Sequence, residues 1–202
     1  MPIPDANARV AALRSGQVDF IEAPAPDAVP SLKAAGMQIV TNIYPHNWTW
    51  FLAQIPGSPW TDLRVRKAAN LGIDRSGLKT LLGGLMVEGQ GVVPKGHPWY
   101  GKPTFELKHD PDAARKLLAE AGYSPQKPLR TKVAISSSGS GQMQPLPMNE
   151  FIQQNLREIG IEVEFEVFEW QALIECWKAG AGSPSARGCH ALNISQGPVS
   201  YT

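Results

Sequence analysis

The chain has 202 residues, with 19 Lys or Arg against 18 Asp or Glu, so its formal net charge is +1. Nucleic-acid-binding domains usually carry a clear excess of basic residues, and this balance argues against that class. Hydrophobic residues make up 43% of the sequence, enough to bury a core, and no run of about 18 apolar residues predicts a membrane-spanning helix.

The first fifty residues predict two helices and several extended segments. Residues 7–15 form a helical pattern that Gly16 ends, and a second helix begins at the capping residue Asp27 and ends before Gly36. Each helix is followed by a short apolar run, VDFIEA and MQIVTNIY, and both runs predict strands. The next run, NWTWFLAQI (47–55), is apolar on both faces and predicts a strand covered on two sides.

The stretch PWTDLRVRKAANLGIDRSGL (59–78) raises the question of nucleic-acid binding, because it concentrates basic residues. Asp62 is placed to cap a first helix and Asp74 a second, and basic side chains flank the apolar stripe of the first helix. A DNA-reading helix-turn-helix needs a recognition helix with exposed base-reading groups, whereas the second helix is short and contains Gly77. We therefore interpret the basic residues as the solvated face of a packed helix pair.

Residues 85–109 are rich in Gly and Pro and predict a long connection, which in a compact domain is usually functional or wraps over a surface. The following stretch, DPDAARKLLAEAGY (110–123), predicts a helix. Asp110 is its cap, Pro111 lies in its first turn and Gly122 ends it.

From about residue 129 strands and helices alternate. LRTKVAIS predicts a strand, and a Ser/Gly loop and a helix follow it. IEVEFEVFEW alternates apolar residues with glutamates, which predicts a half-exposed strand. A helix over Trp170 to Ala179 and a strand over CHALNIS (189–195) complete the series. Strands separated by helices imply right-handed crossovers in a parallel or mixed sheet, so the predicted fold class is α/β.

Catalytic and metal chemistry find little support in the residue pattern. SSSGSGQ (136–142) lacks the Gly-Lys-Ser/Thr ending of a nucleotide P-loop; it is either a linker or a ligand-contacting loop, because strand-to-helix loops bind small ligands in open α/β folds. No G-x-S-x-G elbow is present. The histidines follow no ligand pattern; they are His46, His97, His109 and His190. We predict no enzyme activity, no cofactor and no metal site.

The two cysteines, Cys176 and Cys189, are too few for a tetrahedral zinc site. A disulfide between them is one interpretation, if the chain occupies an oxidising compartment. Two unpaired buried thiols are the favoured interpretation.

Three stretches in this order carry a resemblance: PWTDLRVRKAANLGIDRSGLKTLLGGL, the Gly/Pro-rich segment with PKGHPWY, and DPDAARKLLAEAGY. Together they resemble the family 5 extracellular solute-binding proteins, the dipeptide- and oligopeptide-binding class that serves ABC importers. LRTKVAIS, NEFIQQNLREIGIEVEFEVFEW and, upstream, ARVAALRSGQVDFIEAPAPDAVPSLKAAG extend the resemblance over about residues 6–196. The resemblance implies a periplasmic-binding-protein-like type II fold, in which two lobes close on a ligand about a hinge.

Members of that family are usually more than twice as long and begin with a signal peptide, whereas MPIPDANARVAAL has no basic region followed by an apolar one. The resemblance implies that residues 1–50 are the end of the first lobe's first segment, leading to the hinge. Residues 51–202 are then the second lobe, incomplete at its C-terminal end. The alternative is an α/β ligand-sensing or enzyme domain that reuses this fold.

The resemblance also implies partners and a location. The protein would be a monomer that captures a small-molecule or peptide ligand and delivers it to ABC permease subunits in the membrane, driven by separate ATPase subunits. It would be periplasmic, or lipid-anchored outside the cell in a Gram-positive organism.

Peptide-binding members hold peptide termini with charged groups, commonly an acidic residue after the strand that CHALNIS matches. Here NISQGPVSYT has no carboxylate, and SSSGSGQMQPLP (136–147) has no Arg. The implied ligand is therefore a small peptide, a neutral polar, amine or opine-like solute, or a nickel complex. The candidate ligand contacts, chosen by position, are Trp48, Trp50, Ser137, Ser138, Gln142, Trp170 and Gln196.

Overall fold

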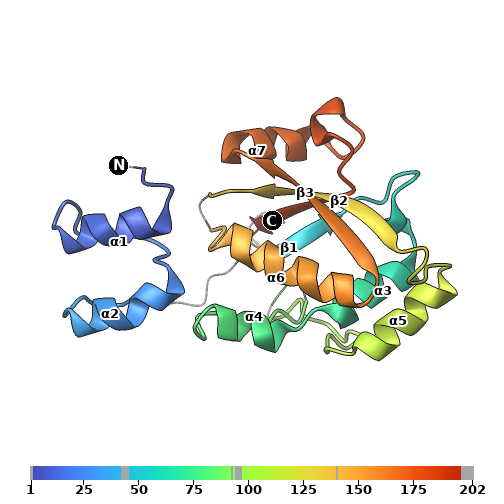
Figure 1. Cartoon of the computed structure of the whole chain (residues 1–202), viewed down its shortest axis with the longest axis horizontal. Helices are drawn as coiled ribbons and strands as arrows, with labels where there is room; N and C mark the ends of the chain where they lie inside the picture. Colours follow the sequence, from blue (N-terminus) through green and yellow to red (C-terminus); the bar gives the residue numbers. More distant parts are fainter. Residues whose placement is uncertain (1, 42–45, 92, 94–96, 140, 197–202) are drawn as a thin grey trace.

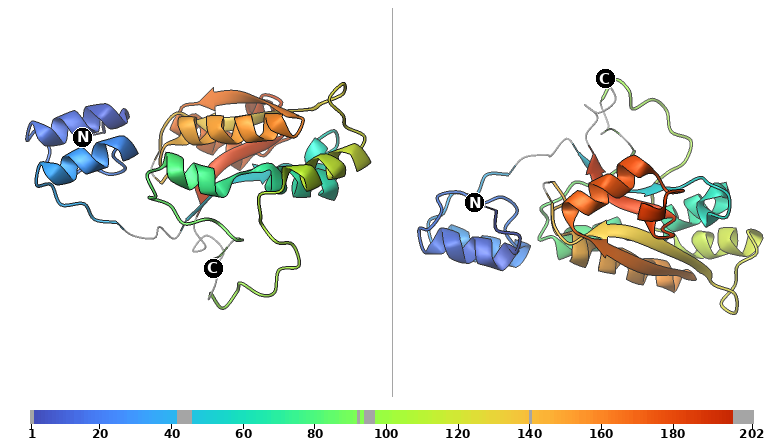
Figure 2. Two further views of the ribbon diagram at one scale, coloured as in Figure 1. Left: turned by 60° about the horizontal axis from the view of Figure 1, so that its bottom comes forward. Right: turned by 90° about the horizontal axis from the view of Figure 1, so that it is seen from above.

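The computed structural model describes residues 2–41, 46–91, 93, 97–139 and 141–196. Within these residues the chain forms a helical N-terminal unit and a larger α/β unit built on one sheet (Figure 1). The N-terminal unit consists of α1 (Ala6–Arg14), a 3-10 turn (Pro26–Ala28) and α2 (Val29–Ala34). Its helices lie beside the α/β unit rather than against the sheet (Figures 1 and 2).

The sheet of the described residues is mixed, and its strand order is β1-β4-β2-β3. β2 runs parallel to both β3 and β4, whereas β1 runs antiparallel to β4. This arrangement confirms the predicted α/β class. The strands are β1 (Asn47–Leu52), β2 (Leu129–Ser136), β3 (Ile161–Phe168) and β4 (Ala191–Gln196).

Helices cover both faces of the sheet (Figure 2). On one face lie α3 (Leu63–Gly72), α5 (Pro111–Glu120) and α6 (Pro145–Glu158), whose buried side chains share one large core cluster with β2 and β3. On the other face α7 (Trp170–Ala179) packs over β4. Two short 3-10 turns, Pro59–Thr61 and Pro184–Ala186, complete the unit together with α4 (Arg75–Leu81).

Alternation along β2 supplies both cores, because successive side chains of a strand point to opposite faces. Val133 and Ile135 belong to the large cluster under α6, whereas Ala134 belongs to the cluster under α7. β1 also contributes to both clusters: Trp50 packs against the first and Phe51 against the second. The predicted strand that is covered on two sides is therefore confirmed.

Three of the four predicted caps form as expected. The fourth prediction, Asp27, is wrong: it lies inside the 3-10 turn Pro26–Ala28, and α2 begins after Ala28 without a side-chain cap. Asp62 Oδ1 accepts from Arg64 N at 2.8 Å, and Asp74 Oδ1 accepts from Gly77 N at 2.9 Å. Asp110 Oδ1 accepts from Ala113 N at 3.0 Å. These bonds satisfy backbone N–H groups that the first helical turn leaves without a partner.

The basic side chains of residues 59–78 contact their own unit. Arg64 pairs with Asp62 at 2.6 Å, and Arg66 Nη1 donates to Trp60 O at 2.5 Å. Arg75 Nη2 donates to Asn70 Oδ1 at 3.0 Å. These contacts tie the basic residues to the packing of the helix pair.

Two predicted strands of the N-terminal unit are wrong. Residues 18–23 and 37–41 form bends and coil, and residues 42–44 of the second run lie outside the described residues. A strand is stabilised by backbone hydrogen bonds to a neighbouring strand, and within the described residues the sheet does not extend to these segments. Two of their apolar side chains are largely exposed, Phe20 by 79% and Val40 by 76%.

Candidate functional site

One edge of the sheet gathers most of the predicted contact residues. Because β2, β3 and β4 are parallel, their carboxyl ends meet there, the position where open α/β sheets bind ligands. The candidate loop (residues 137–144) leaves β2 at this edge, and α7 begins there after β3. We call it the carboxyl edge.

The antiparallel strand β1 starts at the same edge. Its first residue, Asn47, lies opposite Gln196, the last residue of β4, and Trp48 lies opposite Ser195. The chain therefore enters the sheet through β1 and reaches the end of β4 at one point of the carboxyl edge. The side chain of Gln196 lies outside the described residues.

The candidate loop packs on Trp170. Gly139 has φ +141°, and a Cβ atom at this position would lie 2.5 Å from Trp170 Cε3. The close approach of loop and indole therefore requires glycine. Trp170 is the first residue of α7 and is itself partly buried against the smaller core cluster. The residue before it caps the helix, since Glu169 Oε2 accepts from Gln171 N at 2.8 Å.

The three polar candidates of the loop differ in exposure. Ser137 is exposed and Ser138 is half-buried. Gln142 is fully buried, and its Oε1 accepts from Ser195 N at 3.1 Å. In this conformation Gln142 ties the loop to β4, while Ser137 is the most exposed of the three.

The two candidate tryptophans of β1 are partly buried. Trp50 Nε1 donates to Asn149 Oδ1 at 2.8 Å, and its ring meets Phe165 edge-on with centroids 6.2 Å apart. Trp48 packs against the large core cluster and against a third cluster, which is formed by Leu78, Leu82 and Met148. Its Nε1 is buried and has no hydrogen-bond partner among the described residues.

Sequence reasoning missed two residues at this edge, Asn149 of α6 and Asn193 of β4. Both are fully buried, and Asn149 Nδ2 donates to Asn193 Oδ1 at 2.9 Å. A signal was present, because each is a polar residue in an apolar pattern. Asn149 shares the helical stripe of Ile152 and Leu156, and Asn193 interrupts the apolar strand ALNIS.

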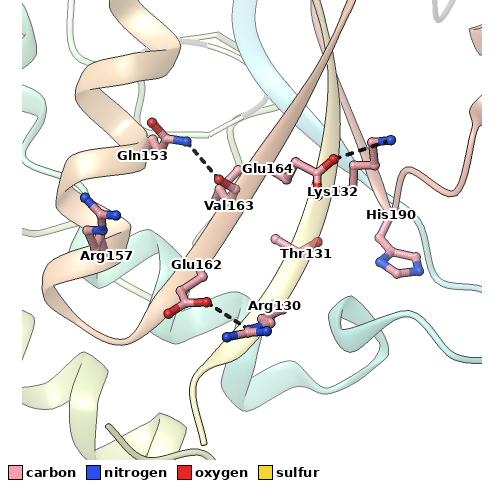
Figure 3. Close-up of a pocket in the computed structure, with 9 residues that line it drawn as sticks. All are labelled: Arg130, Thr131, Lys132, Gln153, Arg157, Glu162, Val163, Glu164 and His190. Atoms are coloured by element: carbon pink, nitrogen blue, oxygen red, sulfur yellow. Dashed lines mark hydrogen bonds and ion pairs between the residues drawn. The ribbon is translucent and has the colours of Figure 1, made fainter. Parts of the chain in front are cut away.

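The other half of the same strands carries charges. A cavity of about 600 Å³ there is lined by residues of β2, β3 and α6, together with His190 (Figure 3). Arg130 pairs with Glu162 at 2.9 Å, and Lys132 contacts Glu164 at 3.6 Å (Figure 3). The predicted solvent-facing glutamates of β3 thus form a cross-strand ladder with basic residues of β2, and the two signs of charge neutralise each other there.

Cys176 and Cys189 are both free and buried in the core cluster under α7, as the favoured interpretation predicts. Burial raises the pKa of the Cys189 thiol to about 11, and burial also raises the pKa of Cys176. The thiolate is the reactive form, so both groups are poor nucleophiles at neutral pH.

Among the described residues, no group of three or more His, Cys, Asp or Glu side chains could hold a metal ion. The helices of the same residues include none that is both long and apolar enough to cross a membrane.

The fold places the chain in a class. NikA from Staphylococcus aureus, solved in complex with Ni(L-His)2, matches with a TM-score of 0.77 at 19% identity, over 96% of this chain and 39% of that chain. At this identity the likeness shows the fold alone, and the fold is that of the type II periplasmic binding proteins.

The sequence then identifies the family. The model for bacterial extracellular solute-binding proteins, family 5 middle, matches residues 1–188, and the chain belongs to this family. The di/tripeptide-binding protein 2 of Pseudomonas aeruginosa is 29% identical over 177 residues, 87% of this chain and 33% of that protein. The probable di/tripeptide-binding protein 5 of the same organism is 32% identical over 182 residues, 88% of this chain and 33% of that protein. The chain thus spans about a third of the length of these relatives, which are substrate-binding proteins rather than enzymes.

Proposed function

We propose that the chain forms one lobe of an ABC-importer binding protein, together with the segment that leads to its hinge. Residues 51–202 are the second lobe in this proposal, and residues 1–50 are the end of the first lobe's first segment. The observation that carries it is the pairing of Asn47 with Gln196. The pairing brings the start of β1 and the end of β4 together beside the candidate loop. Two adjacent connections to another lobe at this point could bend as a hinge.

The ligand we propose is a small peptide, in line with the di/tripeptide-binding relatives. Ser137 and Ser138 would bond its polar groups, and Trp48 would contribute to the apolar wall beside them. Trp50, Gln142 and Trp170 would shape the wall behind them, and Gln196 would lie beside the hinge. A neutral polar, amine or opine-like solute and a nickel chelate are the other outcomes that a binding assay distinguishes.

In this proposal ligand binding works by shifting an open–closed equilibrium. A ligand that contacts both lobes binds the closed form better, and this difference in affinity sets how far the population moves. The closed protein, a monomer outside the cytoplasmic membrane, would then deliver the ligand to permease subunits driven by separate ATPase subunits.

A tryptophan fluorescence titration tests the proposal, with Ala-Ala-Ala and Ni(L-His)2 as probes. We expect a saturable change with Ala-Ala-Ala, and we expect Ser137→Ala/Ser138→Ala to weaken the affinity by about thirtyfold, since each of the two lost hydrogen bonds costs roughly 1 kcal/mol. Ser76→Ala, an exposed serine of α4, is the matched control and should change nothing. Saturation with Ni(L-His)2 alone would replace the peptide by a metal chelate. No saturable change with either probe, in this chain or in any longer protein that contains it, would contradict the proposal.

A further inference from the structure

Two buried asparagines join the start of α6 to the strand pair β1–β4. Asn149 Nδ2 donates to Pro145 O at 2.8 Å and to Asn193 Oδ1 at 2.9 Å, while Asn149 Oδ1 accepts from Trp50 Nε1 at 2.8 Å. Asn193 Nδ2 donates in turn to Thr49 O at 3.0 Å. Both asparagines are 0% exposed. The two bonds that Asn149 Nδ2 donates are buried, where a missing partner is most costly, whereas the bonds to Trp50 and Thr49 are part-buried.

The bonds of Asn149 specify its residue type. A primary amide has two donor hydrogens and one acceptor oxygen, and Asn149 uses both hydrogens and the oxygen on three different groups. A leucine would fill the space but leave the indole N–H of Trp50 unpaired. An ionised aspartate would face two acceptors, Pro145 O and Asn193 Oδ1, without a hydrogen to give. Asn149 lies in the apolar stripe of α6, yet its hydrogen bonds are directional and fix the orientation of the groups that it contacts. Apolar packing alone does not fix orientation in this way.

The candidate loop is tied to the same strand. Gln142 Oε1 accepts from Ser195 N at 3.1 Å, and Ser195 lies two residues after Asn193 on β4. The loop therefore meets β4 at one point, and the helix that follows the loop meets it at a second point. Opposite these two residues of β4 stand Trp48 and Trp50 of β1.

We propose that Asn149 is a positioning residue, which holds the candidate loop and the Trp50 indole in one fixed arrangement on the β1–β4 pair. The inference rests on the proposed function, because that function assigns ligand contacts to the candidate loop and places the hinge next to the β1–β4 pair. The arrangement itself is a property of the chain without ligand. Movement of the loop would then be transmitted through Asn149 to the strands, and movement of the strands to the loop.

Hydrogen exchange followed by NMR on the 202-residue chain tests this inference without any ligand. Two signals report on it: the Trp50 indole N–H, assigned with Trp50→Phe, and the backbone N–H of Ser195. In Asn149→Leu we expect both to exchange about tenfold faster or more. The Trp50 N–H loses its acceptor, Asn149 Oδ1. The Ser195 N–H donates to Gln142 Oε1, and it loses protection if the loop that carries Gln142 is no longer held. Asn149→Ser, which stays polar and admits a water, should shift both signals in the same direction by a smaller factor.

Gln153→Leu is the matched control. Gln153 lies one turn further along α6, and its Nε2 donates to a single carbonyl, Val163 O, at 2.8 Å. The substitution removes an amide donor from the same helix without touching the strand pair, so both reporter signals should keep their wild-type exchange rates. Equal acceleration in Gln153→Leu would show a general loosening of α6 and would overturn the positioning role.

The remaining outcomes also decide the question. If Asn149→Leu folds and the Ser195 amide exchanges within about twofold of the wild-type rate, Asn149 does not hold the loop and the inference fails. If neither Asn149 variant folds, the residue is a requirement of folding and the inference fails as well. A peptide titration that shows no binding leaves these exchange rates unchanged, so failure of the proposed function and failure of this inference are separate results.

Discussion

The two halves of the central strands use opposite kinds of polar contact. Near their amino ends, β2 and β3 carry an exposed ladder of ion pairs, in which Arg130 is 79% and Glu162 48% exposed. At the carboxyl edge, neutral amides form a network around Asn149 and Asn193, and both of these side chains are fully buried. Exposed ion pairs contribute little because water competes for each charge, whereas a buried amide that loses its partner has no water to replace it. We therefore expect the exposed ion pairs to tolerate substitution, and the buried amides at the carboxyl edge to tolerate it poorly.

The substitution with the largest expected effect breaks the buried half. Asn193→Ala removes the acceptor of Asn149 Nδ2 and the donor to Thr49 O, and it leaves a void in a fully buried place. We expect the free energy of unfolding, measured in urea, to fall by about 2–4 kcal/mol. Glu164→Gln, on the exposed ladder, should lower it by less than about 0.5 kcal/mol. Equal losses in the two variants would contradict the contrast between the two halves.

Local patterns predicted most of the α/β unit, because their signals are local. The alternation in IEVEFEVFEW and the caps Asp62 and Asp110 depend on residues within one or two turns, and the structure has a strand and two caps there. The asparagine pair is different in kind. Asn149 and Asn193 are 44 positions apart, and only the fold brings them together. Their polarity in apolar stripes marks them as unusual, but it does not name the partner.

The same reasoning explains the two wrong strands. Residues 18–23 and 37–41 have the apolar composition of strands, yet a strand exists only where another strand offers its backbone groups. That partner is a property of the whole protein rather than of the segment. The candidate loop was located correctly between β2 and α6, since its position follows from the order of elements, while the burial of Gln142 follows from a contact with Ser195, 53 positions away.

An intermediate effect is expected at Gly139 in the candidate loop. Alanine there would meet the Trp170 ring at 2.5 Å and would have to adopt φ +141°, a backbone conformation that costs about 1–3 kcal/mol for other residues. We expect Gly139→Ala to lower the free energy of unfolding by that amount and to change the tryptophan emission. Gly182→Ala is the control, because a Cβ atom at Gly182 meets nothing within 4 Å. A neutral Gly139→Ala would show that the loop is free to move away from Trp170.

The smallest effect is expected on the charged half, and it depends on pH. The hydrogen bond from Lys132 and then that from Arg187 lower the pKa of Glu166 below its ordinary value of 4.5. A carboxyl whose pKa is lower in the folded state stabilises the fold above its unfolded pKa. As the pH falls through the folded pKa, Glu166 takes up a proton and this contribution is lost.

Glu166→Gln should therefore be less stable than the wild type at pH 7, and the difference should close as the pH falls below 4.5. High salt should narrow the difference at pH 7, because solvent ions screen ion pairs that lie at the surface. Glu162→Gln, whose partner Arg130 is far more exposed than Lys132, should show a smaller difference at every pH. Urea unfolding curves at several pH values measure all three proteins. A difference for Glu166→Gln that persists unchanged at pH 3 would mean that packing, rather than charge, accounts for the role of Glu166. The ladder would then resemble the asparagine network more closely than its exposure suggests.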